Sequence, residues 1–70
     1  MMKLNVFGRS VEVVQRNNKW MVFYLGNEGK KRLADDIYIP DHVPHSEVVG
    51  YIADLCHEWA TQAHPTVTIL

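Results

Sequence analysis

A chain of 70 residues is long enough for one small domain, and folding hides only about 60% of its surface, so its stability is marginal. The hydrophobic fraction of 47% argues against disorder, and the lack of an apolar stretch of roughly 20 residues argues against a membrane-spanning helix. The net charge of -1 hides a strong asymmetry, because all seven Lys and Arg residues lie in the first 32 positions, whereas six of the eight acidic residues follow. This asymmetry indicates either a basic sheet attracted to an acidic helix or a charged partner.

The first half of the chain predicts a β-meander. Residues 2–7 alternate with a period of two, which is typical of a strand. Gly8-Arg9 suits a type II′ hairpin turn and leads into a second strand over about 10–16. Asn17-Asn18 tolerates the positive φ of a type I′ turn, so we expect a third strand over 19–25.

These two turns fix the register of the three strands, and the register can be tested against the hydrophobic pattern. One face of the sheet then collects almost only apolar residues: Leu4, Val6, Val11, Val13, Trp20, Val22 and Tyr24. We expect this face to form the core, together with Ile37 and Ile39 of a later connector.

A turn with glycine at both ends follows the third strand and predicts a fourth strand over about 30–34. If Leu25 pairs with Lys30, then Lys30 and Arg32 project onto the face opposite the core, whereas Leu33 joins the core face.

The C-terminal half predicts one helix over about 44–63. Pro44 suits its first turn, and Pro65 disfavours helical geometry at the residue before it. Residues 66–70 alternate again and predict a short last strand that pairs with an edge of the sheet. The predicted fold is therefore α+β, a single domain over residues 1–70 with an antiparallel sheet of three to four strands packed on one C-terminal helix. The apolar stripe of the helix consists of Val48, Val49, Ile52, Leu55, Cys56, Trp59 and Ala63.

The sheet face opposite the core is mixed rather than polar. Its apolar residues would form an exposed patch unless another chain, a loop or the tail of this chain covers them. These candidate partner-binding residues are Phe7, Val14, Met21, Phe23 and Leu25. Basic residues accompany them and are candidate nucleic-acid contacts: Lys3, Arg16, Lys19, Lys30 and Arg32.

The residues that could support chemistry do not form a recognisable site. Cys56 and His57 are adjacent on the predicted helix and point about 100° apart, so they cannot bind one metal ion or act as nucleophile and base. The carboxylates of Asp35 and Asp36 diverge in an extended segment. His42 and His45 have no matching pair at a recognised spacing. With no nucleophile elbow or phosphate loop present, we expect no enzyme, metal, cofactor or small-molecule ligand.

A single cysteine cannot form an internal disulfide, and the N-terminus lacks the apolar run of a signal peptide, so we expect a cytoplasmic protein without membrane contacts. Two functions fit these features. The first is an interaction module that self-associates or binds a protein partner through the mixed face. The alternative is a nucleic-acid platform, in which the basic residues contact phosphates and Phe7 and Phe23 stack on bases.

The element order, a three- or four-stranded antiparallel sheet followed by one helix, is similar to that of small DNA-binding domains such as the arm-binding domains of tyrosine recombinases and the plant AP2 domains. This similarity is one of architecture, and it implies DNA recognition by the sheet. The acidic second half departs from those basic domains. The chain is equally compatible with the families of small bacterial proteins of uncharacterised function.

Overall fold

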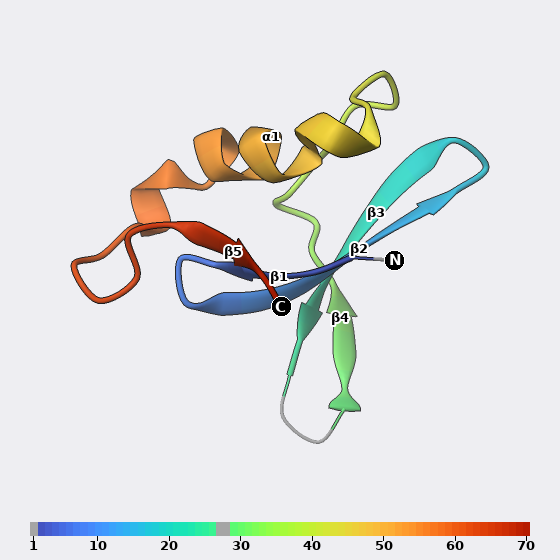
Figure 1. Cartoon of the computed structure of the whole chain (residues 1–70). Helices are drawn as coiled ribbons and strands as arrows, with labels where there is room; N and C mark the ends of the chain where they lie inside the picture. The colour runs from blue at the N-terminus through green and yellow to red at the C-terminus, as the bar shows by residue number, and fades with distance from the viewer. Residues whose placement is uncertain (1, 27–28) are drawn as a thin grey trace.

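One helix covers one face of an antiparallel sheet, as Figure 1 shows. The structure is a computed structural model that describes residues 2–26 and 29–70. In this part of the chain the sheet has five strands in the order β4-β3-β2-β1-β5, which confirms the predicted α+β fold with its short last strand. The strands are β1 (Met2–Val6), β2 (Arg9–Arg16), β3 (Lys19–Leu25), β4 (Lys31–Leu33) and β5 (Val67–Ile69).

The turn between β1 and β2 lies one residue earlier than predicted. It is formed by Phe7 and Gly8, whose φ angles are 50° and 93°, rather than by Gly8 and Arg9. The Gly8 N–H donates to Asn5 Oδ1 over 2.7 Å. A Cβ atom at Gly8 would lie 2.9 Å from the His64 ring, so both the backbone angle and the space require glycine. The β1–β2 register moves by two residues, which leaves the paired side chains of the two strands on their predicted faces.

The turn between β2 and β3 is the predicted one. Asn17 and Asn18 have φ angles of 51° and 63°, and Arg16 pairs with Lys19 as expected. The predicted core face is confirmed, because its members are buried or pack against the buried cluster: Leu4, Val6, Val11, Val13, Trp20, Val22 and Tyr24.

The predicted helix over 44–63 is too long. A 3₁₀ turn, η2 (His45–Glu47), precedes α1 (Val48–Leu55), and a second 3₁₀ turn, η3 (His57–Trp59), follows it. Helical geometry ends at Cys56, where φ is -102° and ψ is 16°. The η3 turn and the extended segment after it return the chain toward β1, where β5 pairs.

The early end of α1 follows from contacts that the periodic pattern cannot reveal. In η3 the Trp59 ring packs against Tyr24, with centroids 6.3 Å apart, and the Arg9 guanidinium lies 3.9 Å from the Trp59 ring centre. Two members of the predicted apolar stripe consequently lie outside the core, since Leu55 is 46% exposed and Ala63 is exposed as well. Tertiary packing therefore outweighs the local helical preference here.

The core lies between α1 and the sheet and includes the connector after β4. Val48 and Ile52 are fully buried on α1, and Ile37 and Ile39 are buried beneath them as expected. The Trp20 indole N–H donates to the carbonyl of the connector residue 43 over 3.0 Å. No helix in the described ranges is long and apolar enough to cross a membrane.

The β3–β4 register differs from the prediction by one residue. Leu25 pairs with Lys31 rather than with Lys30, and the Gly26 N–H donates to the Lys30 carbonyl over 2.7 Å. A shift of one residue exchanges the two faces of a strand. Arg32 therefore lies beside Tyr24 on the helix side, which corrects its predicted position.

Candidate functional site

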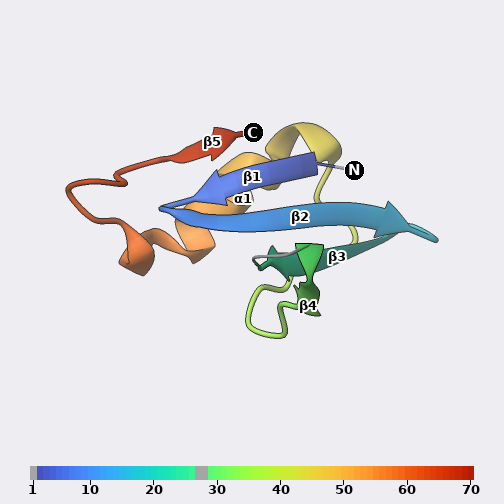
Figure 2. The same ribbon diagram turned by 90° about the horizontal axis from the view of Figure 1, so that it is seen from below.

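The open face of the sheet, which we define as the face opposite α1, is the first candidate site. Seen from below, β1 and β2 pass in front of α1, which lies behind the sheet (Figure 2). The tail does not fold across this face, because β5 pairs with β1 and extends the sheet sideways. Residues 67–69 therefore do not cover the patch.

Four of the five predicted partner-binding residues lie on this face and are partly exposed: Val14, Met21, Phe23 and Leu25. Phe7 does not. It occupies the β1–β2 turn, is only 7% exposed, and packs edge-on against His57 with ring centroids 6.4 Å apart. Its predicted place in the patch is wrong because the turn begins one residue earlier. Leu33 joins the patch instead, since it pairs with Phe23 and is 51% exposed.

An ion pair between a buried carboxylate and a half-exposed lysine lies on the open face. Glu12 is 1% exposed, and Lys31 Nζ donates to its Oε1 over 2.6 Å. The hydrogen bond from Lys31 lowers the pKa of the Glu12 carboxyl below its ordinary value, and burial partly opposes this effect. Sequence reasoning missed the pair because it depends on the β3–β4 register.

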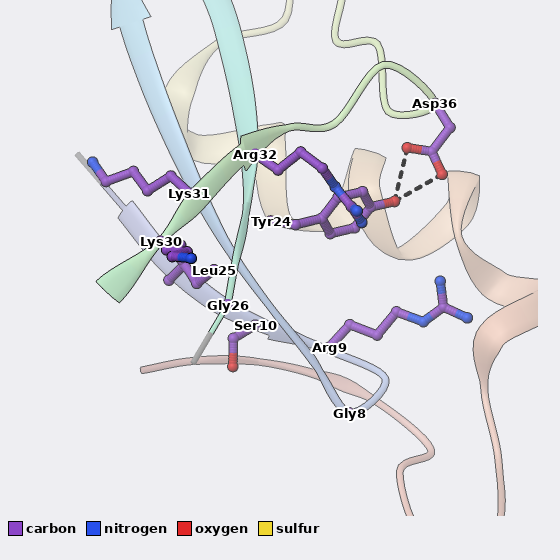
Figure 3. Close-up of a pocket in the computed structure, with 10 residues that line it drawn as sticks. All are labelled: Gly8, Arg9, Ser10, Tyr24, Leu25, Gly26, Lys30, Lys31, Arg32 and Asp36. Atoms are coloured by element: carbon purple, nitrogen blue, oxygen red, sulfur yellow. Dashed lines mark hydrogen bonds between the residues drawn. The ribbon is translucent and has the colours of Figure 1, made fainter. Parts of the chain in front are cut away.

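Three of the five predicted basic contacts lie on the open face. Lys3 pairs with Glu12 in the sheet, and Arg16 pairs with Lys19 beside the β2–β3 turn; all three basic side chains are exposed. Lys30 and Arg32 lie elsewhere, in a cleft between two hairpins (Figure 3). The structure thus separates the basic residues that the sequence placed together.

The cleft opens where the ladder between β2 and β3 stops. Their last pair is Val11 with Tyr24; beyond it β2 follows β1 and β3 follows β4, and the two hairpins diverge (Figure 1). The cleft has a volume of about 940 Å³. In it the Tyr24 hydroxyl donates to the Asp36 carboxylate over 2.7 and 2.8 Å. Burial, assisted by this hydrogen bond, raises the pKa of Tyr24 to about 12.

The residues that could hold a metal or act as a nucleophile do not assemble. Within residues 2–26 and 29–70, no three His, Cys, Asp or Glu side chains come close enough to bind one ion. Cys56 is buried, and burial raises the pKa of its thiol, which disfavours the reactive thiolate.

Comparison with known proteins identifies a family. The family described as "Domain of unknown function (DUF7661)" matches residues 1–70. No curated protein and no solved structure matches the chain.

Proposed function

Since the chain belongs to that family of unknown function, we propose from its own surface that it is a non-enzymatic interaction module, which binds an acidic protein partner through the open face of the sheet. The observation that supports this most directly is a partly exposed apolar patch that β5 leaves uncovered. The patch consists of Val14, Met21, Phe23, Leu25 and Leu33.

The composition of the patch suits a protein interface. Phe and Met are enriched in interface cores, and a contiguous apolar patch on a small domain typically marks a binding surface. Phe23 lies near its centre, between Glu12 and Leu33 on the neighbouring strands. A partner that covers Phe23 would also shield the ion pair beneath it from water, which strengthens that pair.

The charges on the open face favour an acidic partner. Lys3, Arg16 and Lys19 are exposed around the patch. Among the strand residues of this face, the one carboxylate is that of Glu12, which is buried and already paired. Two copies packed face to face would bring like charges together, which costs binding energy, whereas a partner with an acidic rim would attract them.

Nucleic acid is the weaker candidate. Stacking platforms for single strands use several aromatic rings, and the burial of Phe7 leaves Phe23 as the one predicted stacking ring on the open face. The basic residues are also divided between the open face and the cleft.

The proposal can be tested by titrating isotope-labelled protein with a synthetic peptide of four Leu and Phe residues flanked by Glu on both sides. We expect the amide signals of Val14, Met21 and Phe23 to shift together. The same peptide with Lys in place of Glu should bind at least about tenfold more weakly. Phe23→Glu should abolish binding, whereas Leu55→Glu, the same change at an exposed position of α1, should leave it intact.

Three outcomes would overturn the proposal. The first is equal binding of the Glu and Lys peptides, or no shift on the open face. The second is a salt-sensitive response of the same amides to a single-stranded oligonucleotide that exceeds the response to the peptide, which would identify a nucleic-acid platform. The third is self-association that Phe23→Glu abolishes, which would identify a second copy of the chain as the occupant.

A further inference from the structure

The cleft between the two hairpins is separate from the centre of the open face and has its own chemistry. Its walls come from the start of β2 on one side and from the end of β3 with β4 on the other. Because β2 and β3 are no longer paired there, their backbones diverge and form the two walls. Its volume of about 940 Å³ lies within the range of small-ligand sites.

Two arginines line this cleft from opposite walls, Arg9 on β2 and Arg32 on β4. Each guanidinium lies against an aromatic ring: Arg9 is 3.9 Å from the centre of Trp59, and Arg32 is 5.6 Å from the centre of Tyr24. The two rings pack on each other, with centroids 6.3 Å apart. Figure 3 shows the Arg32 side chain over the Tyr24 ring and Arg9 on the other wall. Stacking leaves the N–H groups at the edge of a guanidinium available as hydrogen-bond donors.

The positive charge of the two arginines is not neutralised within the described part of the chain. No carboxylate there forms an ion pair with Arg9 or Arg32, whereas Lys31, on the same wall as Arg32, is already paired with Glu12. Among residues 2–26 and 29–70, Asp36 is the one carboxylate that lines the cleft, and both its oxygens accept the Tyr24 hydroxyl. Cations therefore outnumber carboxylates in the cleft, and a planar guanidinium matches the oxygens of a phosphate group.

We propose that this cleft is a binding site for a ligand with two linked phosphate groups, held by Arg9 on one wall and Arg32 on the other. A diphosphate offers two linked anionic groups, one for the arginine of each wall, whereas a single phosphate group offers one. Lys30, which also lines the cleft, adds positive charge on the β4 side. Asp36 orients Tyr24 beneath Arg32 and limits the affinity, because its negative charge repels the ligand.

The chain offers a direct assay because it contains only three arginines: Arg9, Arg16 and Arg32. We would follow their side-chain Nε–H signals by NMR while adding inorganic pyrophosphate to the labelled protein. The signals of Arg9 and Arg32 should shift together and saturate, whereas that of Arg16, at the far end of β2, should not move. Inorganic phosphate should bind at least about tenfold more weakly than pyrophosphate, because it reaches one wall.

Matched variants separate a built site from general charge attraction. Arg9→Gln and Arg32→Gln should each weaken pyrophosphate binding about tenfold or more, and Arg16→Gln, with the same loss of charge, less than about twofold. Asp36→Asn keeps an acceptor for Tyr24 and removes the negative charge, so it should tighten binding severalfold. If a nucleoside diphosphate binds more tightly than pyrophosphate, the ligand is a nucleotide. If the two bind equally, the site recognises the diphosphate group alone.

The proposal is overturned if Arg16→Gln weakens binding as much as Arg32→Gln, or if the arginine signals stay unchanged up to about 10 mM pyrophosphate. It is also overturned if a single-stranded oligonucleotide moves all three arginine signals and pyrophosphate moves none. Arg32 lies on a short edge strand, so Arg32→Gln is expected to fold, and dispersed amide signals would verify this for every variant. Because Phe23 does not line the cleft, Phe23→Glu should leave pyrophosphate binding intact, which keeps this test independent of the proposed protein partner.

Discussion

Replacing Ile52 with alanine should remove a large part of the stability of the fold. Ile52 and Val48 are the two fully buried residues of α1. The substitution deletes three carbon atoms at about 0.8 kcal/mol each, and the cavity left behind raises the loss to about 3 kcal/mol. A domain of 70 residues has a free energy of unfolding of about 4–10 kcal/mol, so a third or more of it would be lost.

The matched control is Leu55→Ala, which deletes the same number of carbon atoms from the same helix. Leu55 is 46% exposed, so its loss should stay below about 1 kcal/mol. Urea unfolding can be followed by the fluorescence of Trp20 and Trp59, which both pack against the core. With a denaturant slope of about 1 kcal/mol per M, the Ile52→Ala midpoint should fall by about 3 M and the Leu55→Ala midpoint by less than about 1 M. Equal losses would refute the placement of Leu55 outside the core.

Three further substitutions test single interactions. The hydrogen bond from Lys31 lowers the pKa of Glu12, so the ionised carboxylate stabilises the fold above about pH 4.5. This stabilisation is lost as the pH falls below that value. Glu12→Gln should therefore make the free energy of unfolding, measured by urea unfolding at several pH values, depend less on pH on the acid side. Burial raises the pKa of Tyr24 to about 12, which favours the neutral phenol, so the stability of the fold should fall as the pH rises from 10 toward 12. In an ultraviolet titration of the tyrosines, Tyr24→Phe should remove the ionisation step at the highest pH. Trp20→Phe leaves the Val43 carbonyl without its indole donor and should cost about 1 kcal/mol in urea unfolding, whereas an unchanged midpoint would show that the hydrogen bond contributes nothing.

The meander and the core face could be predicted because short, local features determine them. Asn17-Asn18 forms the turn that its sequence favours, and this turn fixes the β2–β3 register. The β1–β2 turn was misplaced by one residue, yet the register moved by two, so Leu4 and Val6 stayed on the core face. Because side chains alternate between the two faces with a period of two, a register error of two residues does not change the predicted face of a residue.

The elements that were predicted wrongly depend on contacts between distant residues. Phe7 adopts a positive φ, which is uncommon for an aromatic residue, and its ring is buried against His57 in a segment 50 positions later. The β4 register differs by one residue from the most direct pairing, and no feature of the sequence distinguishes the two. Arg32 consequently changes face, and the cleft that it lines with Arg9 could not be expected from the pattern.

The same limits apply to the two candidate sites. Four residues of the open patch follow from the well-determined β2–β3 hairpin, so they could be identified from the sequence. Only the structure shows where each strand ladder ends. The ion pair between Glu12 and Lys31 and the cleft between the hairpins both depend on these ends.

The pairing of β5 with β1 has a consequence for the order in which the sheet is completed. Val6 pairs with Val67, so the outer edge of the first strand stays unpaired until residues 67–69 have left the ribosome. The β1–β2 and β2–β3 hairpins need only neighbouring residues and can form early, whereas closing the β1–β5 ladder requires a loop of about 60 residues. A nascent chain that stops before residue 67 would present a hydrogen-bonding edge that other unfinished copies could pair with, so pauses in synthesis before this residue should promote aggregation.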